Sequence, residues 1–308
     1  MNVVVLVGGV GGAKLAYGLA QVLPPEKLTV IVNTGDDFWR YGLRICPDLD
    51  TIMYTLSGLV DPVNGWGIAG DTLNALQQLR AYGEDDWFRL GDRDLATHIL
   101  RTRLLHAGVP FTEVTERLTK SLGISQRILP MTDAPVATMI ETMEYGEIEF
   151  QEYFVRHRWQ PTVKALRLEG IDKAVLTPAV DQALKVADAI LIGPSNPWLS
   201  IEPILAVSGM RDAIMKRDVP RVAVSPIVGG QAIKGPAAKM MAELGYPVSA
   251  ASVAAYYGDM LNGFVYDQMD AGLLVPQPHV LNCETVMNTT NDKVLLARTV
   301  LDWIKGWS

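Results

Sequence analysis

The sequence has few of the features that mark secreted, membrane-spanning or disulfide-stabilised proteins. It contains only two cysteines, Cys46 and Cys283, and their spacing fits neither a disulfide framework nor a metal-ligand motif. No apolar run reaches the roughly 20 residues that a membrane-spanning helix needs. Residues 2–13 are apolar but lack a cationic start and are interrupted by glycines, which argues against a signal peptide. We therefore expect a cytoplasmic protein with reduced thiols and no membrane partner.

Positive charge and clustered histidines are also scarce. The chain has 27 lysines and arginines against 34 aspartates and glutamates, which gives a formal net charge of −7. A protein with scattered positive charge is a poor partner for nucleic acid or for an anionic membrane surface. The four histidines show no ligand spacing, so we assign them no metal. Any phosphate group must then be bound by local backbone amides, a few cations or a metal ion.

The strongest pattern in the sequence is a glycine-rich turn near its start. An apolar run at residues 3–7 predicts a buried strand, residues 8–14 read GGVGGAK, and residues 15–23 predict a helix. Glycines allow backbone N–H groups to approach a phosphate closely, and a helix dipole favours an anion at the helix N-terminus. The arrangement predicts a phosphate-bearing ligand, and the alternative is a tight turn with Lys14 in solvent.

This turn does not match the common nucleotide-binding motifs. Lys14 stands where the dinucleotide motif G-x-G-x-x-G has its third glycine, and Leu15 replaces the Ser or Thr of a P-loop. Asn33 occupies the strand end at which an acid would hold the ribose of NAD. A nicotinamide-dependent dehydrogenase is therefore disfavoured, whereas a phosphate or nucleotide cradle is retained.

Short apolar runs separated by helices predict the fold class. Continuous β-branched runs joined by helices are typical of a parallel sheet that is covered on both faces. Such runs occur at residues 3–7, 28–33, 189–192, 221–224 and 263–266, with helices at 179–186 and 210–216. We predict an α/β fold with a doubly wound, mostly parallel, Rossmann-like sheet.

The chain shows no repeats or linkers, so we predict a single α/β domain over residues 1–308. A helical insertion at about 51–125 would form a substrate wall or lid. Its predicted helices span residues 72–82, 95–106 and 111–122, and a further helix is predicted at 294–304. The segment 127–170 is predicted to be β-rich, with strands at 136–140 and 150–155.

Polar and small residues follow four of the predicted strands. Ligands of open α/β sheets bind beyond the carboxyl ends of the strands, so these residues are candidates for substrate binding. The candidates are Gly9, Gly11, Gly12, Lys14, Asn33, Thr34, Asp37, Ser195, Asn196, Gly229 and Gly230. Turn formation alone would explain the glycines and prolines, but not the repeated Ser, Asn and Asp.

Four aspartates lie within fifteen residues after the second strand: Asp36, Asp37, Asp48 and Asp50. One of the last two could cap the helix predicted at 51–56, but capping needs only one acid. Carboxylates beside a phosphate loop suit Mg²⁺, which takes one or two of them together with substrate phosphate oxygens. We predict Asp36, Asp48 and Asp50 as metal ligands, and Asp48 and Asp50 as catalytic residues.

Two arginines flank a predicted helix start. Asp71 and Asp92 have the pattern of helix N-caps, and Arg89 and Arg93 beside Asp92 could reach an anionic ligand or lie in solvent. The aromatic residues Trp66, Tyr82 and Trp87 are interpreted as core, with a stacking wall for a planar heterocycle as the alternative.

Seven motifs occur together in an order that resembles a known family. They are GGVGGAKL, VNTGDD, CPDLDT, LGDRDLATHI, LPMTD, GPSNP and SPIVGG, and they cover residue 1 to roughly residue 260. The combination is similar to the 2-phospho-L-lactate transferase (CofD-type) family of coenzyme F-420 biosynthesis. That family includes bacterial members that transfer phosphoenolpyruvate.

The resemblance implies a magnesium-dependent transferase acting on the deazaflavin Fo. The terminal ribityl hydroxyl of Fo would attack the phosphorus of a guanosine-diphospho-linked three-carbon acid, and GMP would leave. By position, the family's Fo-contacting aspartate falls on Asp50 and its contacting basic residue on Arg89. The resemblance also implies a homodimer. The identity of the three-carbon acid stays open, and a non-catalytic nucleotide-sugar-binding regulator of the same superfamily is the alternative.

Overall fold

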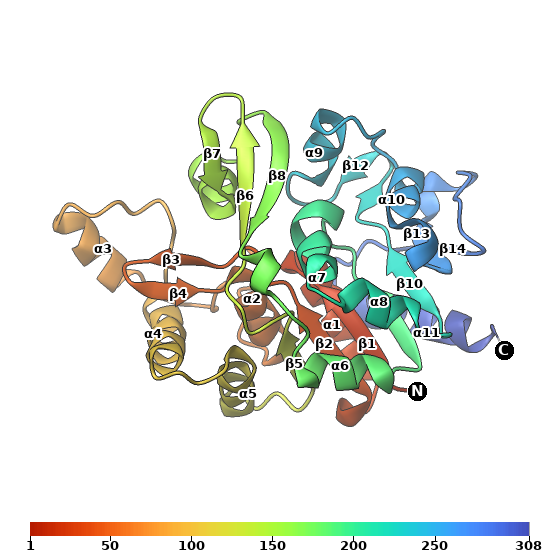
Figure 1. The fold of residues 1–308 in the computed structure, drawn as a ribbon, viewed down its shortest axis with the longest axis horizontal. Coiled ribbons are helices and arrows are strands. Elements are labelled where there is room, and N and C mark those ends of the chain that lie inside the picture. The colour runs from red at the N-terminus through yellow and green to blue at the C-terminus, as the bar shows by residue number, and fades with distance from the viewer. Residues whose placement is uncertain (308) are drawn as a thin grey trace.

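The computed structural model describes residues 1–307, and its centre is a seven-stranded parallel sheet (Figure 1). The strands are β1 (Val3–Val7), β2 (Leu28–Val32), β5 (Arg127–Pro130), β9 (Ala189–Ile192), β10 (Arg221–Val224), β13 (Gly263–Asp267) and β14 (His279–Cys283). They are arranged in the order β14-β13-β10-β9-β1-β2-β5. The chain order reverses at β1, which pairs with β2 on one side and β9 on the other. This confirms the predicted doubly wound α/β class.

All five predicted sheet strands are present. The sheet contains two further strands, β5 and β14, which the sequence did not predict as part of it. β1 shows why the prediction worked, since every one of its residues is buried and helices cover both faces. β14 is an edge strand whose first residues are exposed, so it lacks the continuous apolar run. β5 lies at the opposite edge and pairs with β2, although the sequence placed it in a separate β-rich segment.

Two layers of helices bury the sheet. One layer contains α1 (Gly9–Val22), α2 (Pro47–Leu56), α4 (Asp92–His106), α5 (Phe111–Ser121) and α11 (Thr290–Lys305). The other contains α6 (Pro178–Lys185), α7 (Glu202–Ala206), α8 (Met210–Met215), α9 (Ala237–Glu243) and α10 (Ala250–Tyr257). Within β1, Val5 faces the first layer and Leu6 the second, because successive side chains of a strand point to opposite faces.

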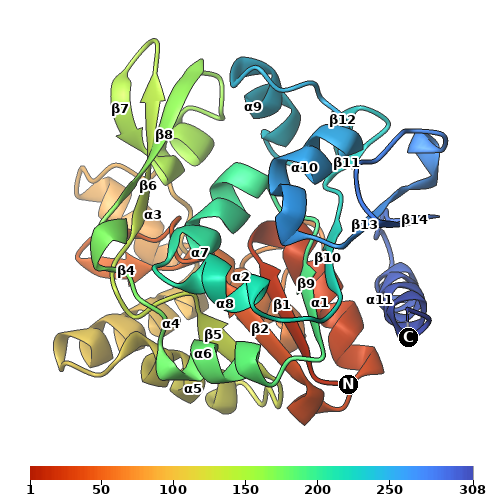
Figure 2. The same ribbon diagram turned by 45° about the vertical axis from the view of Figure 1, so that its right-hand side comes forward.

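A smaller antiparallel sheet rises beside the carboxyl ends of the central strands (Figures 1 and 2). It contains β7 (Gly146–Glu149), β6 (Ala137–Thr142) and β8 (Val163–Glu169) in that order. The strand predicted at 150–155 is wrong, because this stretch is helical and includes η2 (Glu152–Arg156). Phe150 and Tyr153 are buried three residues apart, which is a helical and not a strand spacing.

The segment between β2 and β5 contains the three helices that the sequence predicted. They are α3 (Asn74–Ala81), α4 and α5, and α3 extends away from the central sheet in Figure 1. A hairpin of β3 (Phe38–Arg40) and β4 (Leu43–Ile45) precedes them and was missed. The remaining short elements are η1 (Pro25–Lys27), η3 (Ile171–Lys173), η4 (Pro197–Ile201), β11 (Ile227–Val228), β12 (Gln231–Ala232), η5 (Gly258–Met260) and η6 (Gln268–Asp270). Over residues 1–307, no helix has the length and apolar character that crossing a membrane requires.

Asp92 caps α3, and Asp71 caps α4, so each aspartate caps the helix that is farther from it in sequence. The Asp92 carboxylate accepts hydrogen bonds from the backbone N–H groups of Asn74 (3.0 Å) and Ala75 (2.9 Å) at the start of α3. The Asp71 carboxylate accepts them from Arg93 (2.9 Å) and Asp94 (3.0 Å) at the start of α4. Both aspartates are therefore helix caps, as predicted, but each serves the other's helix.

The glycine-rich turn is shorter than expected, because α1 already begins at Gly9. Gly12 lies in the first turn of this helix and packs on β1. A Cβ atom at Gly12 would lie 2.7 Å from the Cβ of Val7 and 2.7 Å from the Oγ of Ser195. Gly12 thus provides the close contact of helix and strand for which the dinucleotide motif uses its third glycine.

We expect Gly12→Ala to lower the free energy of unfolding by about 1–3 kcal/mol, because overpacking must displace Val7 or Ser195. Urea denaturation followed by circular dichroism measures the effect. Gly306→Ala is the matched control, since its Cβ would meet only the Trp303 carbonyl oxygen, at 3.4 Å. Equal stability of the Gly12 and Gly306 variants would contradict the packing role.

Candidate functional site

A cavity of about 700 Å³ lies where the strand order reverses. The N-terminus of α1 and the segments that follow β2, β9 and β10 form part of its lining. The segment 150–159, which connects β7 to β8, and the segments around Trp66 and Trp87 contribute further lining residues. Ligand sites of open α/β sheets lie at this position, and the volume is in the range of small-molecule sites.

Asp48 lies in the first turn of α2 and is held from two directions. Its Oδ1 accepts a hydrogen bond from the Gly9 backbone N–H (2.8 Å), and its Oδ2 accepts one from Asn33 Nδ2 (3.0 Å). The capping position of α2 is Cys46, whose side chain makes no cap bond, so the N-cap alternative for Asp48 and Asp50 is wrong. Burial raises the pKa of Asp48 to about 6.

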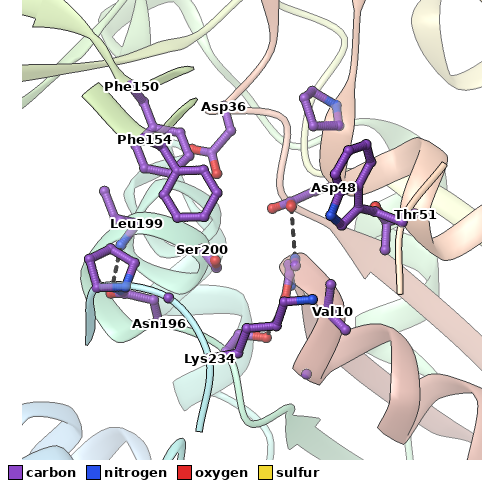
Figure 3. A pocket seen from close by; sticks show the side chains of 18 of the residues that line it. Val10, Asp36, Asp48, Thr51, Phe150, Phe154, Asn196, Leu199, Ser200 and Lys234 are labelled. Atoms are coloured by element: carbon purple, nitrogen blue, oxygen red, sulfur yellow. Dashed lines mark hydrogen bonds between the residues drawn. The ribbon is translucent and has the colours of Figure 1, made fainter. Parts of the chain in front are cut away.

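Asp36 comes from the turn after β2 and also lines the cavity (Figure 3). Figure 3 shows the side chains of Asp36 and Asp48 projecting into the same part of the cavity from different segments. Burial, and then the charge of Asp48, raise the pKa of Asp36 well above its ordinary value. Its Oδ1 is buried and has no hydrogen-bond partner within residues 1–307. Two neighbouring carboxylates, one with an unused oxygen, fit a hard divalent cation such as Mg²⁺.

Asp50 belongs to a different network. The buried guanidinium of Arg101 on α4 pairs with both oxygens of Asp50, through Nη1 to Oδ2 (3.1 Å) and through Nη2 to Oδ1. Nη1 also lies 3.2 Å from His98 Nδ1. Because an arginine can only donate, Nδ1 must accept, and the proton of a neutral His98 lies on Nε2, 3.3 Å from Asp94 Oδ1. Sequence reasoning found Asp50 but none of these partners.

The three predicted metal ligands do not form one group. Across the described part of the chain, the acidic and histidine side chains that gather within 4.8 Å are Asp50, Asp94 and His98, without Asp36 or Asp48. Arg101 already neutralises Asp50 there. The pair of Asp36 and Asp48 is therefore the better place for a cation.

Several predicted binding residues line the cavity. They are Gly9, Gly11, Lys14, Asp50, Arg89, Ser195 and Asn196. Ser195 Oγ donates to the Gly8 carbonyl oxygen (2.8 Å) and accepts from the Gly8 N–H (3.2 Å), which joins the ends of β1 and β9. Asn196 Oδ1 accepts from the backbone N–H groups of Trp198 and Leu199 and so caps η4. Lys14 Nζ donates to the Met287 carbonyl oxygen (2.6 Å).

The other predicted binding residues lie outside the cavity lining. They are Gly12, Asn33, Thr34, Asp37, Arg93, Gly229 and Gly230. Asn33 stands behind Asp48 and orients it. Asp37 is paired with Arg44 (3.2 Å), although burial raises its pKa to about 6. Arg93 donates to the Ala69 carbonyl oxygen, and the Gly229 N–H donates to Asp270.

The sequence also missed much of the cavity wall. Phe150 and Phe154 line it and stack on each other, with ring centroids 5.3 Å apart, and Trp159 lies against Phe154. Their spacing of four residues is the signal that a helical interpretation of 150–155 would have used. Trp66 is 41% exposed and lines the cavity, so its assignment to the core is wrong. Lys234 also lines the cavity and was not among the predicted site residues.

Comparisons with known proteins agree along nearly the whole chain. The model of the family "2-phospho-L-lactate transferase CofD" matches residues 3–285. The 2-phospho-L-lactate transferase of Methanosarcina mazei is 40% identical over 302 residues, which cover 97% of this chain and 99% of that protein. The phosphoenolpyruvate transferase of Streptomyces coelicolor is 46% identical over 276 residues, covering 88% and 86%.

A solved structure shares the fold. The protein of the UPF0052 family from Bacillus halodurans superposes with a TM-score of 0.63 at 15% identity, over 97% of this chain and 98% of that one. At this identity the likeness concerns architecture only. The sequence matches, which are far stronger, define the relationship: this chain belongs to the 2-phospho-L-lactate transferase CofD family.

Proposed function

We propose that the protein transfers a phospho-three-carbon-acid group, phospholactate or phosphoenolpyruvate, from its guanosine-diphospho-linked donor to the deazaflavin Fo. The oxygen of the terminal ribityl hydroxyl forms a bond to the phosphorus that carries the acid. The bond from this phosphorus to the bridging oxygen breaks, and GMP leaves with the electron pair. The hydroxyl proton passes to a carboxylate of the site.

The observation that carries this proposal is the composition of the cavity. One cavity combines a helix N-terminus with lysines, a buried carboxylate pair and a separate aspartate held by an arginine, beside aromatic walls. Phosphoryl transfer depends mainly on positioning and on charge neutralisation. Planar ring systems need aromatic or apolar walls. The family relatives are named as transferases of this kind.

Different residues of the cavity bind the cation, accept the proton and bind the phosphate. Asp36 and Asp48 would hold Mg²⁺, which when bound would neutralise charge on the phosphoryl oxygens. Asp50 accepts the hydrogen bond of the attacking hydroxyl and takes its proton. It retains the capacity to do so, because a carboxylate offers about four lone-pair sites and Arg101 uses only part of them. Lys14 and the N–H groups of the first turn of α1, other than that of Gly9, which is bonded to Asp48, bind phosphate oxygens.

The test is a transfer assay with mass analysis. Purified protein is incubated with Fo, Mg²⁺ and the guanosine-diphospho derivative of lactate, enolpyruvate or glycerate in turn. We expect one donor to give Fo enlarged by one phospho-acid group, with GMP in equal amount, and Asp50→Asn to lose most of this rate. An undiminished rate for Asp50→Asn would remove its catalytic role. Tight binding of a UDP-sugar without any conversion of Fo would favour the nucleotide-sugar-binding alternative.

A further inference from the structure

We infer that Lys234 is a catalytic residue, which acts together with Lys14 to hold the donor diphosphate and to neutralise the phosphate of the leaving nucleotide. This inference rests on the proposed function. Lys234 lies in the loop between β12 and α9, far in sequence from the glycine turn, and lines the same cavity. Figure 3 shows its side chain reaching across the cavity toward Val10 in the first turn of α1.

The two lysines lie close to each other and to the helix N-terminus. A Cβ atom at Gly65 would be 2.8 Å from Val10 Cγ1 and 3.8 Å from Lys234 Nζ. The side chains of Val10, in the first turn of α1, and of Lys234 therefore approach the same loop at Gly65. Burial lowers the pKa of Lys14 and of Lys234, and the charge of Lys14 lowers the pKa of Lys234 further. The two ammonium groups therefore repel one another across this end of the cavity.

Neither ammonium group forms a direct ion pair, although the charge of Asp292 acts on Lys14 from a greater distance. Lys14 Nζ donates to the Met287 carbonyl oxygen, and Lys234 Nζ donates to the Asn64 carbonyl oxygen. Across residues 1–307, no carboxylate oxygen lies within 4.0 Å of either nitrogen. An ammonium has three N–H donors, so each lysine keeps two for a ligand. A group with several negative charges would satisfy these donors and remove the repulsion.

The charges of the cavity are separated in a way that suits a diphosphate. Asp36 and Asp48 come from the segment after β2, whereas Lys14 and Lys234 come from α1 and from the loop after β12. A diphosphate placed between them faces a cation-binding pair on one side and two lysines on the other, beside the N-terminus of α1, whose Gly9 N–H is bonded to Asp48. When the bond to the bridging oxygen breaks, negative charge accumulates on the nucleotide phosphate, and nearby cations stabilise it.

The hydrogen bond from Lys234 to Asn64 has a consequence for binding. It joins the loop around residues 61–67 to the loop around 233–236, and both loops contribute residues to the cavity lining. A phosphate oxygen is a stronger acceptor for an ammonium than a neutral carbonyl oxygen. Donor binding should therefore engage the two N–H donors of Lys234 that Asn64 does not use.

The experiment compares Lys234→Met and Lys234→Arg with the wild-type protein. The probe is GDP, whose binding is measured by calorimetry without Fo. We expect Lys234→Met to weaken GDP binding about tenfold and to lower kcat about a hundredfold, while the KM for Fo stays unchanged. Lys234→Arg, which keeps the charge, should recover part of both effects. Lys239→Met is the matched control, because Lys239 pairs with Glu243 (2.6 Å) outside the cavity lining.

The outcomes separate this inference from the proposed function. Wild-type affinity for GDP and wild-type kcat in Lys234→Met would overturn the inference, even if the protein converts Fo. A change confined to the KM for Fo would also overturn it, because Lys234 would then belong to the acceptor site. If the wild-type protein does not convert Fo but Lys234→Met loses GDP affinity, the diphosphate site is supported and the proposed function fails.

Discussion

Replacing Arg101 by methionine should lower the free energy of unfolding by roughly 3–5 kcal/mol, which is the usual cost of leaving one partner of a buried ion pair alone. Arg101 is fully buried, and its guanidinium pairs with both oxygens of Asp50, which is itself only 5% exposed. The substitution also removes a donor from His98 and from the Arg44 carbonyl oxygen. Urea denaturation followed by circular dichroism measures the loss.

A double variant shows whether the charge or the shape of Arg101 matters. If the unpaired charge of Asp50 causes the loss, Asp50→Asn together with Arg101→Met should recover part of the stability, since neither member of this pair is then charged. Arg167→Met is the control, because Arg167 forms exposed ion pairs and its removal should be hardly measurable. A double variant that is less stable than Arg101→Met would contradict this explanation.

Asp36→Asn should abolish most of the transfer and yet stabilise the metal-free protein above neutral pH. We expect kcat to fall about a thousandfold, the upper range for loss of a preorganised charge-stabilising group. The gain in stability follows from burial, which together with Asp48 raises the pKa of Asp36 well above its ordinary value of 3.8. A carboxyl whose pKa is raised by folding stabilises the fold below 3.8 and loses this contribution as the pH rises through the raised value.

The stabilisation expected for Asp36→Asn increases with pH, so unfolding is compared at alkaline and acidic pH. Thermal unfolding without divalent cations should show Asp36→Asn above the wild-type protein at pH 8, with the difference shrinking at acidic pH. Adding Mg²⁺ should raise the unfolding temperature of the wild-type protein but not of the variant, because binding to the folded state stabilises it. Asp172→Asn, at an exposed position, is the control. An Asp36→Asn protein that still responds fully to Mg²⁺ would remove Asp36 from the proposed cation site.

The central sheet was predictable because its inner strands are buried on both faces. In β1, β2, β9 and β10 this burial produces continuous apolar runs that a single sequence displays directly. The edge strand β14 has an exposed face, so its sequence lacks a continuous apolar run. In the stretch at 150–155 the aromatic and β-branched composition favours a strand, whereas the spacing of the buried residues is helical.

Part of the site followed from the rule that ligands bind at strand ends. That rule selected Lys14, Asp36, Asp48, Ser195 and Asn196, because each follows a predicted strand closely. The rule could not distinguish residues that line the cavity from residues such as Asn33, which lies behind the lining and orients Asp48 by a hydrogen bond. That distinction depends on the direction of each side chain.

The residues that the rule missed come from segments remote in sequence. Lys234 and Phe154 reach the cavity from elements whose position depends on long-range packing. Asp50 was predicted as a site residue together with Asp36 and Asp48. In the structure its hydrogen-bond partner is Arg101, which lies on α4.

Because Asp92 caps α3 and Asp71 caps α4, the position of α3 depends on the position of the cavity wall at the start of α4. If the start of α4 shifts, Asp92 leaves the N-terminus of α3, and if the segment before α3 shifts, Asp71 leaves the N-terminus of α4. Arg89 and Asp94 beside the start of α4 belong to the cavity wall. We therefore expect a ligand that immobilises this wall to slow the hydrogen exchange of α3 as well, a helix that does not line the cavity.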